Sequence, residues 1–135
     1  MKQLDNKNFQ EVLLAYINSL PGLPIAARLD YFNPTEDDLV INAIGGTVDK
    51  VYMDGTREVT LNFEIACKSK NNHRASDTIW AVNAALMGYD LSLPSTDDSY
   101  MFLDLNVEKP GINGKDEQEY FVYTFSLQAK LEIGE

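Results

Sequence analysis

The chain has 135 residues, 44% apolar and 24% charged, which is enough for one globular domain, residues 1–135, with its own hydrophobic core. Its net charge of −10 disfavours gripping nucleic acid by the phosphate backbone, and its single cysteine excludes an internal disulfide. No apolar run has membrane-spanning length, and the start of the chain lacks the order of a signal peptide. We therefore expect synthesis in the cytoplasm and no membrane partner.

The first predicted element is an amphipathic helix of about three turns. Asn8 followed by Glu11 resembles a capping box. Pro21 and Gly22 end the helix, and Pro24 stiffens the connector that follows. The apolar positions that recur at helical spacing are Phe9, Val12, Leu13, Tyr16, Ile17 and Leu20.

An acidic loop is expected next. It contains Phe32-Asn33-Pro34 and the adjacent carboxylates Glu36, Asp37 and Asp38. Three carboxylates can bind a cation, but no further oxygen ligands follow at a set spacing, so we favour a solvated loop. His73 likewise has no second histidine or thiol at metal-ligand spacing, and we predict no metal site.

Three strands are predicted in the first half of the chain. The first two are 39–44, which ends at Gly45-Gly46, and 47–53. Asp54-Gly55 predicts a hairpin turn, because both residues tolerate positive φ. The third strand, of about 12 residues, alternates apolar and polar residues up to Lys68, and Cys67 on its apolar face is expected to be a buried, inert thiol.

A basic stretch, Lys68 to Arg74, precedes the second predicted helix. We interpret it as a hydrated loop, with docking to an acidic surface as the alternative. The helix is expected from Asp77 to Met87, with Ser76 as its cap. Its apolar stripe consists of Ile79, Val82 and Leu86 and is widened by Trp80, Ala84 and Met87.

The last two predicted strands form a long antiparallel hairpin. The first is 101–107 and the second is 119–132, and a flexible acidic turn of roughly ten residues joins them. In the second, the odd positions from Phe121 to Leu131 are apolar, which predicts one buried face. Fourteen residues reach about 45 Å. A domain of this size is only about 37 Å across, so this strand must bend, overhang or be completed by a neighbour.

These elements predict an α+β fold with one mixed or antiparallel sheet of about five strands and two helices packed on it, in the order α-β-β-β-α-β-β. No nucleophile elbow, phosphate-binding loop, dinucleotide fingerprint or HExxH motif occurs. A Cys/His pair has no local signature to support it. We therefore expect a structural or interaction protein without catalytic residues or cofactors.

The charge is unevenly distributed: residues 1–88 carry 11 acids and 8 bases, whereas residues 89–135 carry 10 acids and 3 bases. Under the docking alternative, the basic stretch of one copy meets the acidic C-terminal part of an adjacent copy. The candidate subunit or partner contacts are Lys68, Lys70, Arg74, Asp116, Glu117, Tyr120 and Val122.

As a whole, the chain resembles the tail terminator proteins of long-tailed bacteriophages, also labelled phage minor capsid proteins. Four segments carry the resemblance over nearly the full length. They are the helix ending in Leu20-Pro21-Gly22-Leu23-Pro24, the Asp54-Gly55 hairpin running into Asn62-Phe63-Glu64-Ile65, the polar loop before the helix around Trp80, and the closing hairpin that ends in Phe125-Ser126-Leu127-Gln128-Ala129.

The resemblance implies an α+β subunit of a hexameric ring that caps the tail tube, stops its growth and presents the surface to which the head binds. The implied partners are further copies, the tail tube protein and a head-completion protein, and DNA passes through without specific binding. The implied location is the virion, and the host cytoplasm during assembly. The alternatives are another head–tail connector or tail-completion protein, and a small ligand-binding or enzymatic α+β domain.

Overall fold

The computed structural model describes residues 7–29, 37–88, 91–96, 98, 100–117 and 119–134. Within these residues the chain forms two helices and six strands, and the α+β class and the order α-β-β-β-α-β-β are confirmed, although two of the six strands, the short first and fifth ones, are not among those predicted. The bounds are α1 Lys7–Asn18, β1 Ala27–Arg28, β2 Asp38–Val51, β3 Arg57–Ser69, α2 Asn72–Leu86, β4 Met101–Val107, β5 Gly111–Lys115 and β6 Phe121–Ile133.

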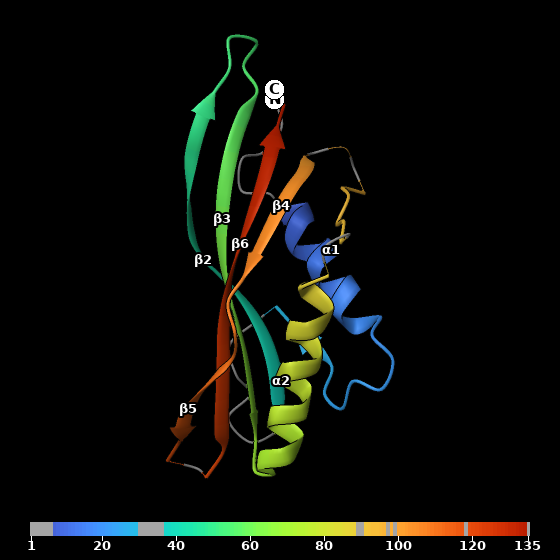
Figure 1. Cartoon of the computed structure of the whole chain (residues 1–135), viewed down its shortest axis with the longest axis vertical. Coiled ribbons are helices and arrows are strands. Elements are labelled where there is room, and N and C mark those ends of the chain that lie inside the picture. Colours follow the sequence, from blue (N-terminus) through green and yellow to red (C-terminus); the bar gives the residue numbers. More distant parts are fainter. Residues whose placement is uncertain are drawn as a thin grey trace.

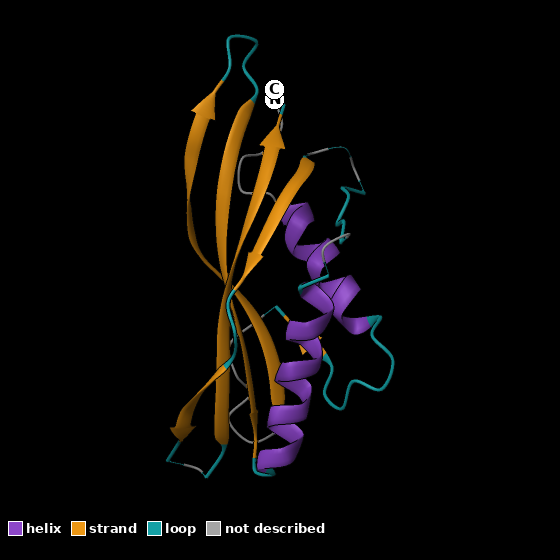
Figure 2. Ribbon diagram, in the orientation of Figure 1, coloured by secondary structure: helices purple, strands orange, loops and turns teal. Residues whose placement is uncertain are grey.

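The strands form one long, twisted sheet, and both helices lie on the same side of it (Figure 1). The order across the sheet is β1-β2-β3-β6-β4, and β5 pairs with the other end of β6. Among the strand pairs of the described residues, the short β1–β2 pair is parallel and the other four are antiparallel. The β2–β3 hairpin extends beyond the helices at one end of the sheet (Figure 2).

From Phe125 onward, β6 has the one-sided burial that its alternating sequence predicts, whereas Phe121 and Tyr123 are only half-buried. Its buried residues are Phe125, Leu127, Ala129, Leu131 and Ile133, and the residues between them are exposed or half-buried. The strand pairs with β3 along 13 residues without a register shift. A slip of one residue would turn every buried side chain toward solvent, so this burial fixes the register. The predicted hairpin with 101–107 is also confirmed.

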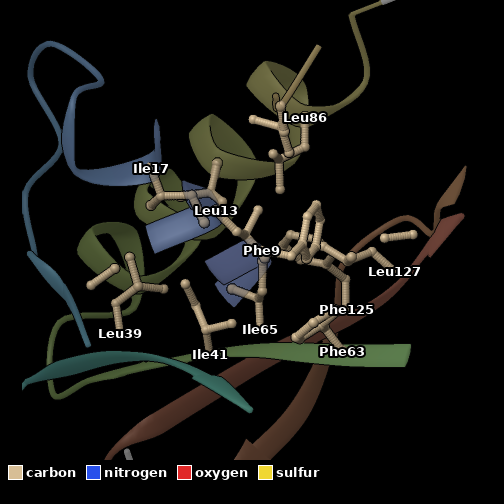
Figure 3. Close-up of a cluster of buried hydrophobic side chains, with 14 of the residues drawn as sticks. Phe9, Leu13, Ile17, Leu39, Ile41, Phe63, Ile65, Leu86, Phe125 and Leu127 are labelled. Atoms are coloured by element: carbon tan, nitrogen blue, oxygen red, sulfur yellow. The ribbon is translucent and has the colours of Figure 1, made fainter. Parts of the chain in front are cut away.

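Between the sheet and α2, side chains of α1 fill the core (Figure 3). Phe9, Leu13 and Ile17 follow one another at helical spacing and are fully buried. The Phe9 ring lies 5.5 Å from that of Phe63 and 5.6 Å from that of Tyr100, measured between centroids. The apolar stripe of α2 is likewise buried at Ile79, Val82 and Leu86, but the residues expected to widen it, Trp80, Ala84 and Met87, are exposed.

The structure corrects the predicted break at Gly45-Gly46. The two expected strands are one strand, β2, and its pairing with β3 shifts register between Ala43 and Gly46 and again between Val48 and Lys50. These irregularities are β-bulges, and Gly45 has a φ of +113°, which favours glycine. The glycine pair bends the strand and does not end it. The predicted Asp54-Gly55 turn is present and joins β2 to β3.

Both predicted helix caps are wrong. Helix α2 begins at Asn72, and the side chain of Asn71 accepts a hydrogen bond from the Arg74 N–H, so Ser76 lies inside the helix. Helix α1 already includes Asn8. The Asn8 side chain instead holds the segment before β4, with Oδ1 accepting from the Ser95 hydroxyl at 2.9 Å and Nδ2 donating to Thr96 Oγ1 at 2.7 Å.

Two predicted loops also differ. Most of the expected flexible turn is β5, which pairs with β6 from Gly111↔Thr124 to Lys115↔Phe121. Asp38 is not solvated: it starts β2, is 4% exposed and accepts a hydrogen bond from Arg28 Nε at 3.1 Å. The remainder of that predicted acidic loop, Phe32 to Glu36, lies outside the described residues.

Candidate subunit interface

The described residues contain no group of three or more histidine, cysteine, aspartate or glutamate side chains that could hold a metal ion. His73 is exposed in the first turn of α2, whereas Cys67 is fully buried in β3. Burial raises the pKa of the Cys67 thiol to about 12, and the nearby Asp37 carboxylate adds to this shift. The buried thiol expected from the sequence is confirmed, and the two side chains do not form a nucleophile–base pair.

The predicted basic contact site is only partly on the surface. Lys68 is 2% exposed, and its ammonium group lies 4.2 Å from the centre of the Tyr120 ring. Tyr120 itself is 3% exposed. This cation–π contact occurs within one chain, which corrects the placement of Lys68 and Tyr120 among accessible contact residues. The expected hydrated loop is reduced to Lys70 and Asn71, between β3 and α2.

Lys70 and Arg74 do lie at the surface. The Lys70 ammonium is 5.3 Å from the same Tyr120 ring, on an exposed residue. Arg74 pairs with Asp37, with an Nη1–Oδ2 distance of 3.6 Å, and donates to the Pro24 carbonyl at 3.0 Å. The basic charge in this region is therefore partly neutralised inside the chain.

The remaining predicted contacts lie around the turn before β6. Asp116 organises this turn, because its carboxylate accepts from the Tyr120 N–H at 2.9 Å and its own N–H donates to the Tyr120 carbonyl at 2.8 Å. Glu117 is exposed and Val122 is half-buried. The sheet thus brings Tyr120 beside Lys68, whereas Glu117 remains available to a partner.

Sequence reasoning missed the two open margins of the sheet. Among the described residues, β1 covers only Leu39 and Val40 of β2, so β2 has no strand on its outer side from Ile41 onward. At the other margin, β4 pairs only with β6. A free strand edge presents unpaired N–H and C=O groups and is a template for another chain. The unusual length of the last predicted strand indicated a free edge, but the sequence did not show the strand order and therefore not which strands lie at the edges.

The β2 margin lies in the projecting hairpin and is apolar. Val48 and Val51 are 54% and 61% exposed, and Met53 at the tip is fully exposed. The turn that carries Met53 is well defined, because the Tyr52 N–H donates to the Thr56 carbonyl at 2.8 Å. Asp49 accepts hydrogen bonds from the hydroxyls of Thr60 and Thr47, and these bonds lower the pKa of its carboxyl.

The β4 margin is apolar as well. Phe102, Leu105 and Val107 face the same side as the core but are only half-buried, and Met101 and Leu103 are exposed. A hollow with a volume of about 280 Å³ lies between this strand and the end of α2, where Leu86 and Met87 contribute to its lining.

One sheet covered by helices on one face, with two free margins among the described residues, defines the class of fold as α+β. The family is shown by the sequence itself, because residues 9–133 match the bacteriophage tail terminator proteins. The chain belongs to this family, and it is a tail-related, virion-associated structural protein of the phage type. No described helix is long and apolar enough to cross a membrane.

Two solved structures share the fold. The first is a chain from the virion of a native gene transfer agent particle, with a TM-score of 0.57, 16% identity and coverage of 93% of this chain and 92% of that chain. The second has a TM-score of 0.51, 15% identity and coverage of 95% and 93%. Comparison with curated proteins gives no match.

The first prediction concerns Cys67. Because the thiol is buried and its pKa is raised to about 12, Ellman's reagent at pH 8 should label native protein far more slowly than protein in 6 M guanidinium, by at least about 100-fold. Stopped-flow absorbance measures both rates. Equal rates would show that the strand around Cys67 is open in solution.

The second prediction separates Lys68 from Lys70. Lys68→Glu places a carboxylate in a buried site directly opposite Asp38 on β2 and against the Tyr120 ring, so the free energy of unfolding should fall by about 3–5 kcal/mol. Lys70→Glu, on the exposed neighbour, should change it by less than about 1 kcal/mol. Urea unfolding followed by circular dichroism tests this, and equal effects would contradict it.

Proposed function

We propose that this chain acts as a tail terminator: copies assemble into a ring, a hexamer by family resemblance, that caps the tail tube and stops its polymerisation. The ring also presents the surface that joins the head. The observation that carries this proposal is the family match over residues 9–133. The proposed partners are the tail tube protein and a head-completion protein, met in the host cytoplasm during assembly, and the role requires no catalysis.

The free margins of the sheet support a ring. Each copy offers two different edges, β2 and β4, and a contact between unlike surfaces is heterologous. Repeating such a contact gives a closed ring where the rotation closes. Closure would also remove both edges, which otherwise invite aggregation.

The face of the sheet away from the helices supports passage of DNA without binding. The half of this uncovered face toward the β2–β3 hairpin, from the Glu58–Glu132 pair to the Glu64–Ser126 pair, consists of eight residues, none of which is buried, whereas Ala66 and Lys68 further along β3 are buried. Of the eight, three are acidic and one is basic, so the surface repels phosphate more than it attracts it. The eight residues are Glu58, Thr60, Asn62, Glu64, Ser126, Gln128, Lys130 and Glu132.

We also propose that Lys70 and Arg74 meet the acidic C-terminal part of a neighbouring copy or partner, where Glu117 is accessible. The charges of residues 89–135 sum to −7, from 3 bases and 10 acids, which makes this surface a suitable partner for a basic side chain.

Reversing one exposed charge tests this contact. Lys70→Glu should weaken self-association several-fold at low salt and have little effect above about 0.5 M salt, because such pairs are screened. Sedimentation velocity at several protein and salt concentrations measures this, with Lys109→Glu as a matched reversal elsewhere on the surface. An unchanged mass for Lys70→Glu at low salt would remove this contact from the proposal.

The function itself is tested with purified tail tubes that lack a terminator. We expect the chain to bind one end of each tube, to appear there as a ring by negative-stain microscopy, and to stop elongation when fresh tube protein is added. Empty heads serve as the comparison. Binding to heads and not to tubes would favour a different head–tail connector, and binding to neither would contradict the proposal.

A further inference from the structure

We propose that neighbouring copies join by antiparallel pairing of β4 of one copy with β2 of the next, in the register that continues the residue rows of the sheet. In this arrangement Leu105 of one copy covers Gly46 of the next. The inference rests on the proposed ring and specifies its contact.

The strand directions allow this pairing without turning a copy over. Each neighbouring pair in the series β2, β3, β6 and β4 is antiparallel. Strand β4 therefore runs opposite to β2. When a second copy is placed beside the first in the same orientation, its β2 lies antiparallel to β4, and the alternation of the sheet continues.

The register of the proposed β4–β2 pairing follows from the rows of residues that lie side by side across the strands of the sheet. One row joins Lys50 to Glu58, Glu132 and Met101, and the next joins Val48 to Val59, Leu131 and Phe102. A further row begins at Gly46, passes through Leu61 and Ala129, and ends at Leu105. Continuing the rows places Lys50 beside Met101, Val48 beside Phe102 and Gly46 beside Leu105 of the adjacent copy.

The β2 margin has a hollow where Leu105 would lie. Its volume is about 230 Å³, and its apolar lining comes from Gly46, Val48, Val59 and Leu61. A Cβ atom at position 46 would lie 2.4 Å from the Thr60 carbonyl oxygen, so only glycine fits there. The glycine therefore lets β3 of the same chain approach β2 closely at this point.

The β4 margin carries the complementary ridge. Phe102, Leu105 and Val107 face the core side but remain half-buried. The residues beside them on β6, Leu131, Ala129 and Leu127, are at most 1% exposed. A strand added to β4 would bury the ridge to the same degree, and Val48 would approach the hollow between β4 and α2.

The opposite face is compatible with the same register. Continuing the row of Thr47, Thr60 and Lys130 places Thr47 beside Asp104 of the adjacent copy, where the Thr47 hydroxyl would exchange its bond to Asp49 for one to Asp104. Lys50 then lies diagonally from Asp104, where cross-strand neighbours of opposite charge attract each other.

A cysteine pair tests the contact. Lys50→Cys and Met101→Cys are placed in one chain, where two intervening strands keep the positions about 14 Å apart and prevent an internal disulfide. Paired across copies, the same positions have Cβ atoms about 5 Å apart. The matched control is Lys50→Cys with Asn106→Cys, because Asn106 lies four rows further along β4, about 14 Å away. Native Cys67 stays in both, since it is buried.

Both variants are oxidised with copper phenanthroline, free and on tail tubes, and run on non-reducing gels. We expect a ladder of covalent multimers for the Lys50/Met101 pair, at least about tenfold stronger than for the control. If tubes are capped and neither variant cross-links, or if both do so equally, this contact is overturned and the terminator function stands. If no oligomer forms and no tube is capped, both proposals fail.

Discussion

The pairing of β3 with β6 is the constraint on which the rest of the structure depends. Both strands are long, both bury one face, and they run together for 13 residue pairs without a shift. Hydrophobic burial sets this register, because a slip by one residue would expose the whole buried set of β6. Every other strand takes its position from this pair, including the two that end up at the margins.

The helices cover only part of the sheet that the β3–β6 pair organises. They pack on one face, and the β2–β3 hairpin continues past them (Figure 1). Apolar side chains such as Val48 and Val51 therefore remain exposed on an ordered strand. Strand β2 carries bulges and Lys50, which usually blunt a free edge, but its apolar side chains stay uncovered. In a protein that belongs to a family of virion components, an exposed ordered edge is consistent with completion by another molecule.

The alternating strands and the amphipathic helices were predictable, because their periodicity directly reflects which face is buried. Features that depend on tertiary pairing were not. Gly45-Gly46 looks like a strand end and is a bulge, and Gly111 to Lys115 looks like a turn but pairs with β6. The same limit applies to the contact site: Lys68 is one of several basic residues in the sequence, and only the fold shows that Tyr120 covers it. Neither free margin could be located before the strand order was known.

The bulges have a consequence for shape. One lies in β2 between Val48 and Lys50, and another in β4 between Phe102 and Asp104, and they fall one row apart on opposite sides of the sheet. Each bulge bends its strand and increases the local right-handed twist. The two margins of the sheet therefore bend at nearly the same level along the strands. Subunits whose two margins bend at the same level can pack side by side around a cylinder without gaps.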